Sequence, residues 1–340
     1  MGEVTIKDVE AKNKSVNEEI KVGNSRGRFR AFTGAREIRI LFVVICVAII
    51  MYLLSPTFLT RSNITAVAIG FATDAIIAIA MTIVLIGGGF DLSVGSVLAF
   101  GGVIVALLLN KGMAIFPAIL VTLIAGALIG TISGLVITKL RVNALITTLG
   151  MMSIISSATL VVSGGYPLSN LPKEFLFLGQ GFIGGIPVAV VIMAVLVLAG
   201  DFLLRRTRLL RLVYYVGSNP GAAALSGISV DRVIIATYIV SGLTAAFAGV
   251  IATSRLSAAF PMAGVGTEMR VISACVIGGC SLSGGEGTVI GSLLGVLLMA
   301  LINNALVLLN VSIYWQGIVS GLILIAAVAF DMLSKKKRTA

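Results

Sequence analysis

Long apolar runs separated by short polar stretches fill this chain of 340 residues from about residue 39 onward. A bilayer core about 30 Å thick is crossed by about 20 helical residues. This length predicts an all-α polytopic membrane protein with about ten transmembrane helices, the shortest being 93–109 and 267–280. The predicted spans are 39–54, 64–86, 93–109, 114–138, 144–163, 182–203, 231–253, 267–280, 288–309 and 313–331.

Composition agrees with this pattern and excludes several kinds of chemistry. Hydrophobic residues make up 58% of the chain and charged residues 11%, whereas an average soluble domain has about 25% charged residues. The chain has no histidine, the commonest general base and metal ligand. Its cysteines, Cys46, Cys275 and Cys280, lie in apolar runs and are interpreted as core residues. We therefore expect no catalytic residue, no metal site and no bound cofactor.

Basic residues predict the orientation. Most of the 25 Lys and Arg fall in four segments: the N-terminal end, 139–141, 205–232 and the "KKKR" at 335–338. Each of these segments is separated from the next by an even number of predicted spans, so all four lie on the same side of the membrane. Short loops rich in Lys and Arg stay in the cytoplasm. The chain is thus divided into a cytoplasmic N-terminal arm (1–38), a permease domain (39–331) and a basic cytoplasmic tail (332–340). No aromatic array accompanies the basic residues, so nucleic-acid binding is not expected.

The segment 281–287, "SLSGGEG", nearly spells a signature of ATP-binding cassette (ABC) ATPases. Such an ATPase also needs a G-x-x-x-x-G-K-[ST] loop to hold the phosphates, and the chain has none. Gly284, Gly285 and Glu286 are instead predicted to form a tight hairpin between two spans. The similar segments 86–96 and 277–287, both on the cytoplasmic side, are either one hairpin design used twice or an instance of the glycine and serine that recur in tightly packed helical bundles.

The longest internal polar-edged segment, 205–232, lies between the sixth and seventh spans. Within it, "GSNPGAAALSGI" at 217–228 begins with a turn signal at Asn219 and Pro220, continues as an alanine-rich stretch and ends near Gly227. This pattern predicts a short helix along the membrane surface. Its small side chains would allow close contact with a cytoplasmic partner.

Four motifs resemble one family: "GGGFDLSVGS" at 87–96, "VNALITTLGMM" at 142–152, "VGSNPGAAALSGISV" at 216–230 and "VIGGCSLSGGEGTVIGSLLG" at 276–295. In this order they are similar to permease subunits of bacterial ABC sugar importers of the ribose, xylose and galactose type. The resemblance covers about 39–331.

The resemblance implies a type II importer in the inner membrane, whose partners are a second permease copy (homo- or heterodimer), two cytoplasmic ATPase subunits or one tandem ATPase, and an extracytoplasmic solute-binding protein. ATP would be bound by the ATPase partner. The segment 205–230 would carry the coupling helix. Its residues would be Gly217, Asn219, Ala222, Ala223, Gly227 and Ile228.

Five polar residues are candidates for the translocation path. Asp91 and Ser93 sit at a predicted helix start, where they either cap the helix or contact solute. Asp74 is the only carboxylate well inside a span, and it lines the path, pairs with Arg270, or lies near the outer interface. Asn303 and Asn304 hydrogen-bond either solute hydroxyls or a neighbouring helix.

Other functions remain open at this stage. The same architecture would suit a nucleoside, a furanone signal, a branched amino acid or another small polar solute. An ion-coupled secondary transporter is disfavoured because ionisable residues within the spans are scarce. The external segments 164–181 and 254–266 are either a docking surface for a binding protein or uninvolved loops.

Overall fold

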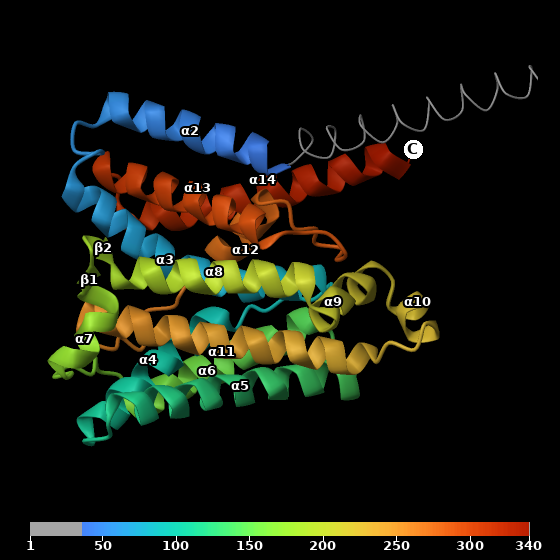
Figure 1. Cartoon of the computed structure of the whole chain (residues 1–340), viewed down its shortest axis with the longest axis horizontal. Helices are drawn as coiled ribbons and strands as arrows, with labels where there is room; N and C mark the ends of the chain where they lie inside the picture. The colour runs from blue at the N-terminus through green and yellow to red at the C-terminus, as the bar shows by residue number, and fades with distance from the viewer. Residues whose placement is uncertain (1–35, 340) are drawn as a thin grey trace, which may run out of the picture.

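The computed structural model describes residues 36–339 as a bundle of helices with one small β-hairpin (Figure 1). Most of the predicted N-terminal arm, together with Ala340, lies outside the described residues. The elements are α2 (Arg36–Leu54), α3 (Arg61–Ile86), α4 (Val94–Asn110), α5 (Ile115–Lys139), α6 (Ala144–Ser163), α7 (Lys173–Gln180), β1 (Phe182–Ile183), β2 (Ile186–Pro187), α8 (Val188–Arg206), α9 (Arg208–Ser218), α10 (Pro220–Leu225), α11 (Val230–Leu256), α12 (Thr267–Ile277), α13 (Val289–Leu308) and α14 (Ile313–Thr339).

Seven of the described helices are long and apolar enough to cross a membrane: α2, α3, α5, α6, α8, α11 and α13. The predicted count of about ten is not confirmed, because three predicted spans fall short of this length. α4 has 17 residues, α12 has 11, and the apolar part of α14 covers 315–329. The predicted span 182–203 also begins later, at Val188, because 182–187 form the antiparallel hairpin β1–β2.

Helix α3 lies at the centre of the bundle. Its N-cap Thr60 accepts a hydrogen bond from the backbone N–H of Asn63, and an almost unbroken run from Ala72 to Ile86 is buried. A helix that is apolar on all faces packs stably only when neighbours surround it. Helices α8, α11, α12 and α13 supply those neighbours (Figure 1).

The bundle has two distinct ends (Figure 1). The end that carries α7 and the β-hairpin is called the α7 end, and the end that carries α9 and α10 is called the α10 end. α3 begins at the α7 end, where Asn63 contacts Asn304 near the end of α13. It finishes at the α10 end, where the carbonyl of Ile86 accepts a hydrogen bond from Gly285 N–H at 2.8 Å.

Two helices begin inside the bundle instead of at an end. α4 follows the irregular segment 87–93, which leads back from the α10 end, and α12 follows 257–266, which leads in from the α7 end. The two starts meet, since a Cβ on Gly264 would overlap the carbonyl oxygen of Gly95. α12 rises only about 17 Å over its length, roughly half of a bilayer core.

The two glycine-rich segments predicted to share one hairpin design begin alike and then diverge. Gly88 and Gly279 both have positive φ, and the N–H groups of Gly89 and Cys280 donate to the carbonyls of Val84 and Cys275, each five positions earlier. Both lie at the α10 end, joined by the Gly285 to Ile86 hydrogen bond. Residues 87–93 lead back into the bundle and start α4, whereas 278–288 form a compact turn from α12 to α13, closed by Ser281 N–H donating to the Glu286 carbonyl at 3.0 Å. The helix-ending part of the predicted repeat is therefore alike in the two segments, the connections that follow it differ, and the repeat itself stays a prediction.

Candidate functional site

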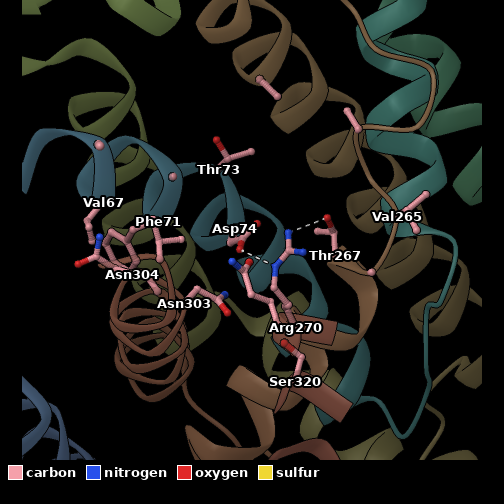
Figure 2. A pocket seen from close by; sticks show the side chains of 18 of the residues that line it. Val67, Phe71, Thr73, Asp74, Val265, Thr267, Arg270, Asn303, Asn304 and Ser320 are labelled. Carbon is pink, nitrogen blue, oxygen red and sulfur yellow. Dashed lines mark hydrogen bonds and ion pairs between the residues drawn. The ribbon is translucent and has the colours of Figure 1, made fainter. Parts of the chain in front are cut away.

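A cavity of about 870 Å³ opens between α3, α11, α12, α13 and α14, in the half of the bundle toward the α7 end (Figure 2). It is large enough for a small polar solute, since ligand pockets usually measure about 300–1,000 Å³. The polar and charged residues that line it are Asn63, Thr73, Asp74, Arg255, Thr267, Arg270, Asn303, Asn304, Gln316 and Ser320.

An ion pair crosses the cavity wall. Arg270, in the first turn of α12, places its Nε 3.4 Å from Oδ2 of Asp74 on α3, and its Nη2 donates to Thr267 Oγ1 at 3.0 Å (Figure 2). The two side chains are 30% and 25% exposed, respectively. The structure thus places Asp74 in the bundle interior with Arg270 as its partner, one of the alternatives that the sequence left open.

The two adjacent asparagines of α13 have different surroundings. Asn304 exchanges two hydrogen bonds with Asn63 of α3, at 3.1 and 2.7 Å, and so links two helices. Asn303 lines the cavity (Figure 2), and within the described part of the chain its side-chain amide has no hydrogen-bond partner. Position along the sequence could not separate these roles, because the two residues are neighbours.

Asp91 and Ser93 do not line the cavity. Asp91 is 3% exposed, and its carboxylate accepts from Ser93 N–H at 2.9 Å, Ser93 Oγ at 2.6 Å and Ser241 Oγ of α11 at 2.6 Å. Ser93, the N-cap residue of α4, makes no side-chain capping bond. The hydroxyl of Tyr238 donates to the Phe90 carbonyl at 2.9 Å. These bonds attach the irregular segment 87–93 to α11.

Three backbone segments meet at the α10 end, and we call this contact the glycine junction: 86–88, 217–218 and 284–285. A Cβ on Gly217 would overlap the Ile86 carbonyl oxygen and lie 2.8 Å from Gly285 N. A Cβ on Gly284 would lie 2.7 Å from the Gly217 carbonyl oxygen. Only glycine permits backbones to approach this closely. The junction therefore fixes the end of α9 against two connections of the membrane bundle.

The predicted short helix at 217–228 is present as α10, preceded by the amphipathic α9. Asn219 caps α10 by accepting from Ala222 N–H at 3.0 Å, and Pro220 occupies its first turn. Gly227 follows with φ of +81°, the left-handed conformation that ends a helix. Ala223 is buried, whereas Leu225 is 93% exposed, so α10 presents an uncovered surface.

Sequence reasoning missed six polar residues of the cavity: Asn63, Thr73, Arg255, Thr267, Gln316 and Ser320. Arg255 and Gln316 lie where spans end or begin, a position that usually indicates a charged or polar rim. The available signal was weak, because only the inward path of 257–266 brings the end of α11 and the start of α14 to one cavity.

A bundle of membrane-length helices around a cavity of mixed polar and apolar lining, with a short helix of small residues at one end, is typical of a membrane permease. The chain belongs to the family described as "branched-chain amino acid transport system / permease component", which matches residues 63–328. It is therefore a multi-pass inner-membrane protein and a transport subunit, not an enzyme.

Named relatives match most of the chain. It is 40% identical to the ribose import permease protein of Haemophilus influenzae over 299 residues, 87% of this chain and 93% of that protein. It is 40% identical to the ribose import permease protein of Bacillus subtilis over 293 residues, 86% and 90% of the two chains. It is 38% identical to an L-arabinose permease protein of Azospirillum brasilense over 285 residues, 84% of each chain. No solved structure matches it.

Proposed function

We propose that this chain is the permease of an ATP-driven, binding-protein-dependent importer for a pentose or hexose sugar. The relatives named for ribose and arabinose import support the solute class. The observation that carries the proposal is the cavity lining, where amides and hydroxyls complement a polyhydroxylated solute. A branched amino acid fits less well, because its ammonium group needs an anion, and Asp74, the only carboxylate in the lining among the described residues, is engaged by Arg270.

Our topology places the α10 end in the cytoplasm with both termini, and the α7 end outside. The arginines of α8 and α9 at the α10 end support this orientation. Counting α4, α12 with its inward segment 257–266, and α14 beside the seven longer helices gives the ten membrane segments of a type II importer. The permease domain then covers 39–331, and the basic tail is 332–340, of which 332–339 continue α14.

Of the six coupling residues, Asn219, Ala222, Gly227 and Ile228 lie on the surface on which an ATPase subunit docks, whereas Gly217 and Ala223 are buried and attach that surface to the bundle. ATP binding would move α10 and α9 together, and the glycine junction would pass this movement to 87–93 and to the turn containing Gly284, Gly285 and Glu286. Because these connections lead to α4, α12 and α13, all of which contribute residues to the cavity lining, the junction supports a direct mechanical route.

In this function the five path candidates have distinct parts. Asp74 and Asn303 form the polar wall of the path, and Asn304 holds that wall to α3. Asp91 and Ser93 shape the irregular segment before α4. The solute-binding protein docks at the α7 end, on 164–181 and 254–266, and a second permease copy completes the assembly.

The test is purification of the tagged chain in gentle detergent with its genomic neighbours coexpressed, followed by uptake of labelled D-ribose and L-arabinose into proteoliposomes. We expect a nucleotide-binding subunit to copurify, and uptake to require ATP and the binding protein. Uptake that persists without ATP and stops when ion gradients collapse would establish the ion-coupled alternative instead. ATP-dependent uptake of leucine but not of sugars would refute the solute class.

Coupling is tested separately with Gly217→Val. Its side chain would force apart the backbones of the glycine junction, so we expect ATP hydrolysis to persist while solute uptake falls at least ten-fold. Gly221→Ala is the matched control, since a Cβ there meets only the Asn219 side chain, at 3.4 Å. Normal uptake by the Gly217→Val protein would exclude the junction as the route.

A further inference from the structure

The polar groups of the cavity divide into those with partners and those without. Asp74 pairs with Arg270, and Asn63 pairs with Asn304. Within the described part of the chain, the side chains of Arg255, Asn303 and Gln316 line the cavity and make no hydrogen bond or ion pair. All three side chains are partly exposed where they line the cavity, so their donors and acceptors are available to a solute there.

Arg255 comes from the last turn of α11, and its guanidinium reaches across to α3. Its Nη1 lies 3.6 Å from the position of a Cβ on Gly70, so the missing side chain at Gly70 leaves room for it. Both Gly70 and Arg255 line the cavity. The guanidinium therefore rests on the wall of the cavity between α11 and α3.

The backbone at Arg255 is held firmly by α7. Ser254 Oγ donates to the Phe175 carbonyl and accepts from Gly179 N–H, both at 2.7 Å. Gln180 Nε2 donates to the Arg255 carbonyl at 2.9 Å and to Ser257 Oγ at 2.7 Å. A Cβ on Gly179 would lie 2.6 Å from Arg255 Cα, which shows how closely the two segments pack. A fixed backbone reduces the freedom that Arg255 loses when it binds a ligand.

We propose that Arg255 is a specificity-determining residue that binds two adjacent hydroxyl oxygens of a neutral sugar, with Asn303 and Gln316 completing the site. The planar guanidinium presents parallel N–H donors, which match two neighbouring oxygen acceptors. The amide oxygens of Asn303 and Gln316 accept from the hydroxyl hydrogens, and their NH₂ groups donate to other hydroxyls. This inference rests on the proposed sugar-import function and names the recognition element within it.

The experiment measures weak binding directly, by saturation-transfer difference NMR on the full chain in lipid nanodiscs. The probes are D-ribose, 2-deoxy-D-ribose, which lacks one of the adjacent hydroxyls, and D-ribonate, which carries a carboxylate. The variants are Arg255→Gln, which removes both the charge and the planar guanidinium with its parallel N–H donors, and Arg255→Lys, which keeps the charge but not the planar group. Arg61→Gln, an exposed cation at the start of α3 outside the cavity lining, is the matched control.

We expect the wild-type protein to bind D-ribose about ten-fold more tightly than 2-deoxy-D-ribose, since hydrogen bonds to a charged group usually contribute this much or more. Both Arg255 variants should reduce this preference to less than two-fold, while Arg61→Gln retains it. If Arg255→Lys keeps the same preference for D-ribose over 2-deoxy-D-ribose, the two parallel N–H donors of the guanidinium are not required, and the proposed recognition of adjacent hydroxyls is overturned. Tighter binding of D-ribonate than of D-ribose, lost in Arg255→Gln, overturns the neutral-sugar assignment in favour of charge recognition.

Failure of the inference is distinguishable from failure of the proposed function. If D-ribose binds and is imported with ATP but Arg255 does not affect the preference, the importer assignment stands and Arg255 is excluded. If none of the three probes binds and the assembled complex imports no sugar, the proposed function itself is wrong. Circular dichroism of each variant in nanodiscs identifies any loss of helical structure before binding is compared.

Discussion

Asp74 and Arg270 join the middle of α3 to the first turn of α12 through one ion pair, 3.4 Å from Oδ2 to Nε. The pair spans 196 positions in the sequence and lies on the wall of the cavity. α12 thus begins beside the central helix, with its first turn facing the space proposed for solute.

Removal of one partner should be more harmful than removal of both. Asp74→Asn leaves the partly buried Arg270 without its counter-charge, and we expect a loss of about 1–2 kcal/mol in unfolding free energy, less than for a fully buried pair because both side chains keep some exposure. Asp74→Asn with Arg270→Gln should recover about half of that loss. Reversible denaturant unfolding in detergent checks this, and strictly additive effects would show that the pair contributes nothing to stability.

Asn303 and Asn304 should separate function from stability. Asn304→Ala removes both hydrogen bonds to Asn63 and should destabilise the fold by about 1–2 kcal/mol. Asn303→Ala should leave stability within about 0.5 kcal/mol of the wild type, since no partner is lost, but should raise the KM for solute uptake. Thermal unfolding and uptake kinetics on the same preparations are the measurements. Equal effects of the two variants on both would contradict the distinction.

The meeting of α4 and α12 makes Gly264 sensitive to the smallest substitution. A Cβ at this position overlaps the Gly95 carbonyl oxygen, so Gly264→Ala must shift the start of one helix, and we expect a loss of at least about 2 kcal/mol. Gly150→Ala in α6 is the control, because its Cβ meets nothing within 4 Å and alanine favours a helix by up to about 1 kcal/mol. Thermal unfolding measures both variants. If Gly264→Ala is as stable as Gly150→Ala, the starts of α4 and α12 are loosely packed.

The buried Asp91 predicts an ordered series of variants. Asp91→Ala leaves two serine hydroxyls and one backbone N–H without their acceptor and should destabilise most, by about 2–5 kcal/mol. Asp91→Asn should cost less, because the amide oxygen retains the bonds from Ser93 and the NH₂ group can donate to Ser241 Oγ. Ser241→Ala removes one bond and should cost least. Denaturant unfolding gives the order, and an Asp91→Ala protein as stable as Ser241→Ala would remove the proposed anchoring of 87–93.

Much of the fold follows directly from hydrophobic length. The spans at 64–86, 144–163 and 288–309 lie within about three residues of α3, α6 and α13, because capping residues such as Asn143 and Thr288 bound each apolar run. The short helix α10 was equally predictable, since asparagine, proline and glycine fix its start and end through local backbone preferences.

The inward segments could not be predicted in the same way. Residues 257–266 are mostly apolar or small and read as an external loop, and only their packing against Gly95 reveals that they enter the bundle. For the same reason the sequence selected Asp74 and Asn303 but missed Arg255, whose side chain reaches the cavity through tertiary contacts. Asp91 was identified as a helix-start residue, but its bond to Ser241 depends on a segment 150 positions away.

Close backbone packing divides the bundle into two stiff units. In one, Gly126 of α5 lies directly against Gly242 of α11, and Leu98 of α4 lies against Gly249. In the other, Gly278 after α12 lies against Gly291 of α13. None of these three contacts has side chains between the backbones that could adjust, so we expect each unit to move as a whole. The cavity lies between the two units. They are joined there by the backbone contact of Gly95 and Gly264, and the ion pair at Asp74 ties α3 to the second unit. We therefore expect a change in the shape of the cavity to come from a displacement of one unit against the other, not from bending of single helices.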